Sequence, residues 1–114
     1  MRGKLIQVFA CGVVCVGLIT SGTALSQAQS GGGETLFKSK CAACHGPDGK
    51  GEVRLGKKLG SPDLTSTGVQ SQSDAQLTDV ITNGKNKMPA YDGKLGKDQI
   101  AELVAYIREL GKKH

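Results

Sequence analysis

The most reactive side chains of this sequence stand together in one short segment, Cys41-Ala42-Ala43-Cys44-His45. Two thiols separated by two residues lie on one side of a helical turn, where both sulfurs can add to the two vinyl groups of a single haem. The residue that follows, His45, can then present its imidazole to the iron. The spacing therefore predicts one covalently attached haem per chain, held by Cys41 and Cys44 and ligated by His45.

Other uses of a Cys-x-x-Cys pair fit this sequence less well. A structural zinc site requires four ligands, but beyond residue 28 the chain has no further cysteine and only one further histidine, His114. A thioredoxin-like redox pair is expected beside a strand–helix–strand pattern, which is missing from the sequence. A plain disulfide would leave His45 without a role. Haem is the cofactor that accounts for all three residues.

An iron ligated by one histidine can bind a gas, act on a substrate or take a second protein ligand. Met88 is the only methionine after Met1. It precedes Pro89, which favours extended geometry at Met88, and such geometry suits a side chain that projects from a loop. Methionine also fills gaps in protein cores, and His114 is an alternative ligand at a terminus. We predict that Met88 is the second axial ligand.

Around this segment the sequence predicts helices joined by loops. A short helix is expected over residues 34–41, and residues 45–63, rich in Gly, Pro, Asp and Lys, are expected to form a loop. Ser73 and Gln76 have the spacing of a capping box, which predicts that a helix begins there. Asn83-Gly84 is expected to end that helix, because both residues tolerate positive φ.

The last helix has the clearest pattern. Gly96 is its expected cap, with Gln99 three residues later, and Gly111 is its expected end. Apolar residues recur at three- and four-residue steps along one stripe: Ile100, Leu103, Val104, Ile107 and Leu110. Since no strand alternation is present, the predicted class is all-α, with three to four short helices and long loops around one haem.

The segment before residue 34 resembles an export signal. Arg2 and Lys4 precede an uncharged apolar run, Leu5 to Thr20, and Ser26-Gln27-Ala28 offers small residues at a cleavage site. The run is shorter than the roughly 20 residues of a membrane-spanning helix. We expect a signal peptide over 1–28, a flexible linker over 29–33 and one domain over 34–114. The protein would then be periplasmic or otherwise exported, with an uncleaved membrane anchor as the alternative.

Two further cysteines, Cys11 and Cys15, lie inside the apolar run and are interpreted as small apolar residues of the signal. Beyond residue 28, large side chains that could fill a core are scarce. The only aromatic residues there are Phe37, Tyr91 and Tyr106. A chain of this size buries only about 60% of its unfolded surface, so a haem would supply apolar volume that the side chains do not.

The charge balance is mildly basic. Removal of residues 1–28 lowers Lys plus Arg from 15 to 13 and leaves Asp plus Glu at 10, so the formal charge falls from +5 to +3. This is too little to indicate a nucleic-acid partner. Lysines at 85, 87, 94 and 97 surround the proposed second ligand and are expected to dock redox partners with acidic surfaces. We expect a monomer that is peripheral to a membrane at most.

The chain resembles the class I cytochromes c, above all short bacterial members and the photosynthetic cytochromes of cyanobacteria and algae. The resemblance spans residues 34–110 and rests on Cys41 to Gly46, on Lys87-Met88-Pro89-Ala90-Tyr91 and on the helix from Ile100 to Leu110. It implies the small cytochrome c fold, in which the first and last helices cross near the haem and Phe37 packs against the 103–107 stripe. At the cap, Gly96 departs from the Ser, Thr or Asp usual in the family.

The resemblance also implies roles for further residues. In Ser61-Pro62-Asp63-Leu64, the carbonyl of Pro62 would accept the ring N–H of His45. With His45 and Met88 both bound, no site for substrate would remain, so the implied function is that of a soluble single-electron carrier and not an enzyme. Two alternatives stay open: a haem subunit of a larger redox complex, and a haem peroxidase or gas sensor with Met88 unbound.

Overall fold

The computed structural model describes Gly12 and residues 31–114. The predicted signal peptide, apart from Gly12, and residues 29–30 of the predicted linker lie outside the described residues, as do Cys11 and Cys15. Residues 31–114 form helices and contain no strand, as the all-α prediction requires. The helices are α1 (Gly32–Lys40), α2 (Ala42–His45), α3 (Arg54–Leu59), α4 (Thr67–Gln70), α5 (Asp74–Asn83) and α6 (Lys97–Lys112). Among these, none is long and apolar enough to cross a membrane.

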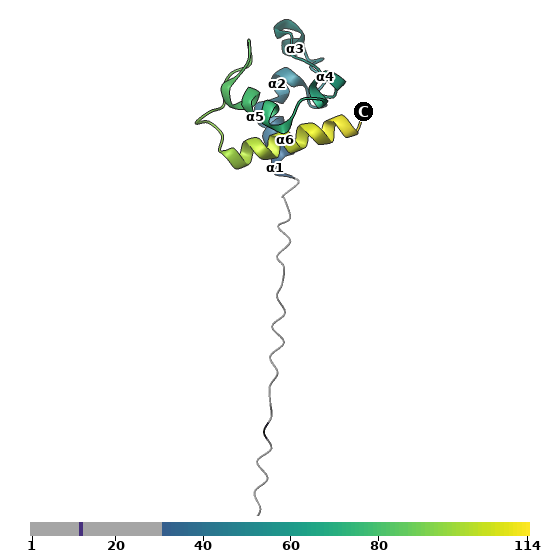
Figure 1. Cartoon of the computed structure of the whole chain (residues 1–114). Helices are drawn as coiled ribbons and strands as arrows, with labels where there is room; N and C mark the ends of the chain where they lie inside the picture. Colours follow the sequence, from purple (N-terminus) through teal and green to yellow (C-terminus); the bar gives the residue numbers. More distant parts are fainter. Residues whose placement is uncertain (1–11, 13–30) are drawn as a thin grey trace, which may run out of the picture.

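The first and last helices cross, and the crossing forms the centre of the apolar core (Figure 1). Gly33 of α1 lies against the main chain of Glu102 in α6, where a Cβ would collide with the carbonyl oxygen. This close approach brings the ring of Phe37, which is completely buried, to 5.2 Å from the ring of Tyr106. The crossing implied by the family resemblance is therefore present.

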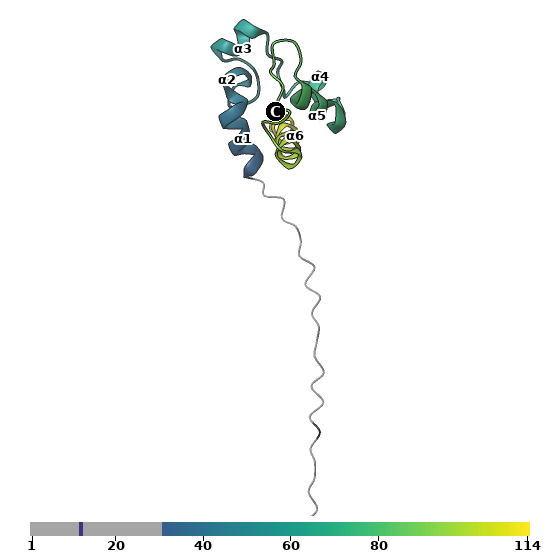
Figure 2. The ribbon, with the colours of Figure 1, turned by 90° about the vertical axis from the view of Figure 1, so that its left-hand side faces the viewer.

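The helices stand in two groups with α6 between them and below (Figure 2). One group is the column of α1, α2 and α3, and the other is formed by α4 and α5. The apolar stripe of α6 faces both groups, and its buried residues are Ile100, Leu103, Val104, Tyr106, Ile107 and Leu110. Helices α1 and α5 both contact α6. Residues of the connecting segments, such as Pro62 and Met88, line the cavity described below.

The prediction of a continuous loop over 45–63 was wrong, because α3 lies within it. This helix ends at Gly60, which adopts the left-handed conformation (φ 71°) and donates its N–H to the carbonyl of Gly56. Gly56 itself is buried so closely against the main chain of Cys44 that any Cβ would collide with the Cys44 carbonyl. Tertiary contact with the Cys-x-x-Cys-His segment, more than local propensity, accounts for this short helix.

The helix boundaries agree with prediction at most positions and differ at two. Around Ser73 the capping box is formed: Ser73 Oγ accepts from Gln76 N at 3.1 Å, and Gln76 Oε1 accepts from Ser73 N at 2.8 Å. The first helix starts at Gly32, so the last two residues of the predicted 29–33 linker are helical. The last helix passes through Gly111 to Lys112 instead of ending there.

Candidate haem site

A cavity of about 430 Å³ lies between the two groups of helices, above α6. This volume falls within the roughly 300–1,000 Å³ of small-molecule and cofactor sites. Apolar side chains from α1, α5 and α6 make much of its wall: Phe37, Leu77, Val80, Ile81, Leu103 and Ile107. The same cavity is lined by the residues predicted to bind haem: Cys41, Cys44, His45, Pro62 and Met88. Folding thus gathers every predicted site residue around one space.

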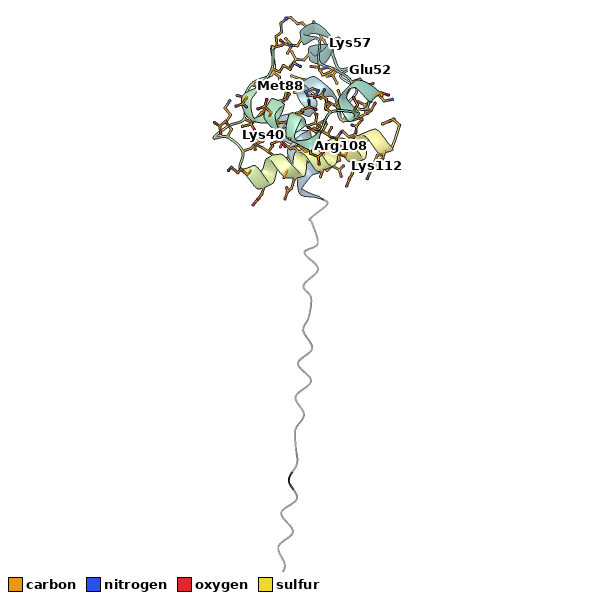
Figure 3. All side chains as sticks on the ribbon, viewed as in Figure 1. Lys40, Glu52, Lys57, Met88, Arg108 and Lys112 are labelled. Carbon is orange, nitrogen blue, oxygen red and sulfur yellow. The ribbon has the colours of Figure 1, made fainter. Side chains whose placement is uncertain are left out.

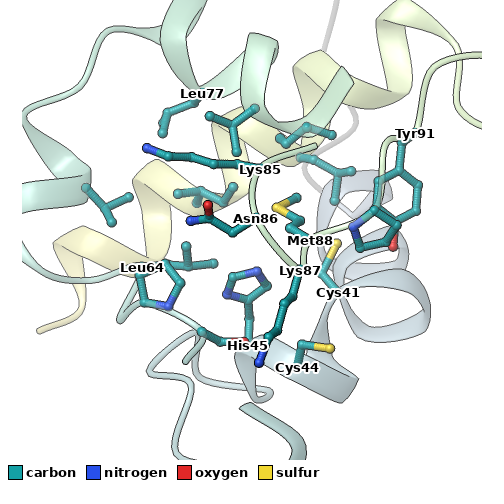
Figure 4. A pocket seen from close by; sticks show the side chains of 18 of the residues that line it. Cys41, Cys44, His45, Leu64, Leu77, Lys85, Asn86, Lys87, Met88 and Tyr91 are labelled. Carbon is teal, nitrogen blue, oxygen red and sulfur yellow. The ribbon is translucent and has the colours of Figure 1, made fainter. Parts of the chain in front are cut away.

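His45 is the last residue of α2 and points its ring into the cavity (Figure 4). The side chain is buried, and burial lowers the pKa of His45, which favours the neutral imidazole that a metal ion needs. The Pro62 carbonyl opposes this effect and raises the pKa, although Nδ1 makes no bond of full hydrogen-bond geometry. Among the described residues, His45 Nδ1 is the only buried side-chain nitrogen or oxygen without a partner.

Cys41 and Cys44 stand together at one side of the cavity, and both are free thiols in this structure (Figure 4). Burial raises the pKa of the Cys41 thiol to about 11, with a smaller contribution from the neighbouring Cys44. The short turn between α1 and α2 sets their positions. The N–H groups of Cys44 and His45, both in α2, donate to the carbonyl of Cys41 at 3.2 and 2.9 Å. The two sulfurs and the imidazole therefore share one rigid segment.

Met88 reaches the cavity from the loop that follows α5 (Figure 3). The loop is a tight turn in which Met88 N donates to the Lys85 carbonyl at 2.9 Å and Lys85 N donates to the Met88 carbonyl at 3.2 Å. Asn86 occupies the turn with a positive φ of 53°, which asparagine tolerates better than most residues. A Cβ at Gly84 would lie 2.6 Å from the Met88 carbonyl, so glycine allows the turn to close.

The loop after Met88 is fastened to both sides of the cavity. Tyr91 N donates to the Ile81 carbonyl of α5 at 3.0 Å, and the Tyr91 hydroxyl donates to the Lys40 carbonyl at 3.0 Å. The second bond joins the methionine loop to the residue before Cys41. Sequence reasoning named Tyr91 as one of the few aromatic residues and as part of the Lys87-Met88-Pro89-Ala90-Tyr91 motif, but it missed this bond. The alternative ligand His114 is exposed and does not line the cavity.

These residues fit a haem. The cavity has the size and apolar lining for a macrocycle, and two free thiols stand at one side of it. The imidazole of His45 faces inward, and its burial favours the neutral form. A thioether on a separate loop completes the donor set. Nitrogen and thioether donors of this kind are those used by iron in electron-transfer haem proteins.

Comparison with known proteins decides the family. A family model described as "Cytochrome C oxidase, cbb3-type, subunit III" matches residues 28–107. Cytochrome c6 of Nostoc sp. (strain PCC 7120) is 38% identical over 109 residues, which cover 96% of this chain and 93% of that protein. The chain belongs to the class I c-type cytochromes.

Further relatives of this cytochrome agree. Cytochrome c6 of Limnospira maxima is 34% identical over 71% of this chain and 92% of its own length. The cbb3-type cytochrome c oxidase subunit CcoP of Azospirillum brasilense is 36% identical, but the match covers only 28% of that subunit. Among solved structures, the KustC0563 c-type cytochrome superimposes with a TM-score of 0.64 at 29% identity, over 68% of this chain and 95% of that one.

Family membership fixes the cofactor and the kind of activity. The cytochrome carries one haem c, bound covalently through two thioethers, and it transfers single electrons without catalysing a reaction of its own. The nearly full-length matches to cytochromes c6 favour the carrier over a subunit of a larger oxidase, since the oxidase subunits match over about a quarter of their length.

Proposed function

We propose that this protein is a soluble, exported electron carrier whose haem is attached to Cys41 and Cys44 and ligated by His45 and Met88. The observation that carries this proposal is that one cavity is lined by both thiols, the imidazole and the only described thioether. Two iron ligands from separate segments would close the coordination shell. A carrier needs such a shell, because it must exchange electrons without binding a substrate.

The haem supplies a one-electron couple, and the chain's residues tune and protect it. A methionine opposite a histidine raises the potential of that couple. Buried side chains such as Phe37 and Leu103, which are 0% and 1% exposed, keep water from one side of the cavity. The tight turn at Lys85–Met88 and the Tyr91 hydrogen bond hold the thioether in place.

Pro62 is proposed to orient the proximal imidazole. Its carbonyl raises the pKa of His45, against the larger lowering by burial, and Nδ1 is the buried atom that lacks a partner. A hydrogen bond from Nδ1–H to the Pro62 carbonyl would fix the ring orientation and leave Nε2 for the iron. Such outer contacts of a metal-bound histidine set its tautomer and its basicity as a ligand.

Export and partner docking belong to the same proposal. The predicted signal peptide over 1–28 would direct the chain to the periplasm or an equivalent compartment, where haem c is attached. Lys85 and Lys87 are exposed and line the mouth of the cavity, and Lys94 is exposed nearby, with its amine 5.9 Å from the Tyr91 ring centre. These cations would meet acidic surfaces on donor and acceptor proteins. We expect the carrier to act as a monomer.

One alternative role has a specific observation in its favour. The match to subunit CcoP and to the corresponding family model suits a haem domain dedicated to an oxidase complex. Purification would separate the two roles. A carrier leaves the cell with the periplasmic fraction after osmotic shock, whereas a dedicated subunit co-purifies with an oxidase after detergent extraction of membranes.

Substitution of Met88 tests the ligand set. Met88→Ala should leave the haem attached and lower its reduction potential. The ferrous variant should bind carbon monoxide, whereas the native protein should not. Met88→His should keep six ligands but also lower the potential. Leu77→Ala is a matched control, since Leu77 lines the same cavity but has no donor atom. An unchanged spectrum and potential in Met88→Ala would refute the assignment and favour a peroxidase or gas sensor with Met88 unbound.

A further inference from the structure

One wall of the haem cavity has little regular structure of its own. The segment 64–72, here called the wall segment, contains only the four-residue helix α4. Nevertheless Leu64, Val69 and Gln72 all line the cavity, and Leu64 and Val69 are each 8% exposed. A short irregular segment keeps such a position only when other parts of the molecule hold it.

Gln70 provides the first connection, from the wall segment to α6. Its side-chain Nε2 donates to the main-chain carbonyl of Leu64 at 2.7 Å and to that of Ile107 at 3.0 Å. The carboxamide can lie this close to α6 because residue 111 is glycine, and a Cβ there would collide with it. The presence of Gly111 inside the helix, where an end was expected, thus has a steric reason.

Arg108 provides the second connection. Its Nη1 donates to the Gln70 carbonyl at 2.9 Å, its Nη2 donates to the Gln72 carbonyl, and its Nε donates to Asp74 at 2.9 Å. The arginine side chain is 24% exposed and the Asp74 side chain 74% exposed. An ion pair with a carboxylate this exposed contributes little to the stability of the fold. The hydrogen bonds from Arg108 to the two main-chain carbonyls therefore do most to hold the wall segment, since hydrogen bonds from a charged donor are strong.

We propose that Arg108 is a positioning residue of the haem pocket, which acts with Gln70 to suspend the wall segment from α6 and so to keep water from the haem. Both side chains bind main-chain carbonyls of the wall segment, and Arg108 binds the one at Gln72, whose side chain faces the cavity. The role rests on haem occupying this cavity. If the wall loosens, water enters and stabilises the more highly charged ferric state, so the reduction potential falls.

The test is made on purified holoprotein by measuring the reduction potential and the rate at which added imidazole binds the ferric haem. In Arg108→Ala the potential should fall and imidazole should bind several-fold faster. Lys112→Ala is the matched control, because Lys112 lies one turn later on α6, is exposed and carries the same charge (Figure 3). This control should change neither quantity. Asp74→Asn, which keeps both carbonyl contacts, should resemble the native protein.

A purely stabilising role for Arg108 would give a different pattern. Arg108→Ala would then lower the melting temperature while its potential and imidazole rate matched those of Lys112→Ala, and that result would overturn the proposal. Should Arg108→Ala fail to fold, Arg108→Lys is measured instead. Lysine keeps the charge, but its shorter side chain and single ammonium lack the two guanidinium nitrogens that donate separately to the Gln70 and Gln72 carbonyls, so the proposal requires a lowered potential here too. An unchanged potential in a folded Arg108→Lys would also overturn it.

Discussion

The hydroxyl of Tyr91 donates a hydrogen bond to the main-chain carbonyl of Lys40, 3.0 Å away and 51 residues earlier in the chain. Lys40 ends α1 immediately before Cys41, and Tyr91 follows the Met88 loop. One bond therefore connects the segment of the thiols to the segment of the thioether. Burial raises the pKa of Tyr91, with smaller contributions from Cys41 and Cys44, so the hydroxyl keeps its proton and remains a donor at neutral pH.

Removal of this hydroxyl should loosen the Met88 loop. Tyr91→Phe deletes one hydrogen bond and keeps the ring, so we expect a loss of about 0.5–1.5 kcal/mol in the free energy of unfolding. We also expect carbon monoxide to bind the ferrous haem faster than in the native protein. Tyr106→Phe is the control, because the Tyr106 hydroxyl makes no hydrogen bond to any described residue. Equal carbon monoxide rates in the two variants would show that the bond does not hold the loop.

The crossing of α1 and α6 should tolerate no side chain at Gly33. In Gly33→Ala the new Cβ would meet the Glu102 carbonyl, which is rigid backbone, and overpacking of this kind costs about 1–3 kcal/mol. Gly31→Ala is the control, since nothing lies within 4 Å of a Cβ there. Urea unfolding of the two variants measures the difference. If both were equally stable, the helices would have to cross with more space than the structure gives them.

The sequence predicted those parts of the molecule whose signals are local. A capping box at Ser73, an apolar stripe on α6 and a Cys-x-x-Cys-His segment each depend on residues a few positions apart. The second iron ligand could be predicted by elimination, because Met88 is the only methionine beyond residue 1. The structure brings all of the predicted site residues to one cavity.

Features that depend on long-range contact were not predictable in the same way. Helix α3 has only six residues, contains Gly56 and is followed by Gly60, so local propensity for it is weak. Its stability comes from the close packing of Gly56 against the main chain of Cys44. Gly111 was predicted to end the helix, but a glycine is needed there because the Gln70 side chain packs against it. That residue is 41 positions away, so the sequence pattern does not reveal the contact. The hydrogen bonds from the side chains of Arg108 and Gln70 go to main-chain carbonyls. Every residue has such a carbonyl, so these bonds leave no pattern in the sequence.

Mass spectrometry should find one haem per exported chain, retained after acid–acetone treatment. Two thioether bonds are expected, so Cys41→Ala or Cys44→Ala alone should leave one bond and reduce the yield of holoprotein. The double variant should release all of its haem into the acid–acetone extract. Ala43→Ser, which changes an exposed residue between the two cysteines, should retain haem as the native chain does. Retention of haem in the double variant would contradict attachment at these thiols.

Export should remove residues 1–28. The small residues Ser26 and Ala28 are the third and the first residue before the expected cleavage position, and N-terminal sequencing of the exported protein should begin at Gln29. Ala28→Phe should block cleavage and leave the chain in the membrane fraction, whereas Gln27→Asn should be processed normally. A native protein that begins at Met1 and stays with membranes would instead support the uncleaved anchor.

The distribution of lysines, more than the total charge, should steer partners to the haem. Two propionates would bring the formal charge of +3 close to +1, which is too small to attract an acidic protein from a distance. Lys85 and Lys87, however, are exposed at the cavity mouth, whereas Lys112 and Lys113 lie at the far end of α6 and do not line it. Charges at the mouth act within the Debye length of about 8 Å at physiological salt.

Hexacyanoferrate(III), an anionic oxidant, is a suitable probe of this field. Its reaction with the ferrous protein should slow as salt is added, because salt screens the attraction. Lys85→Gln/Lys87→Gln should slow the reaction several-fold at low salt and flatten its salt dependence. Lys112→Gln/Lys113→Gln removes the same charge elsewhere and should leave the rate near the native value. If both double variants slowed the reaction equally, net charge alone would govern the encounter, and rates independent of salt would exclude electrostatic steering altogether.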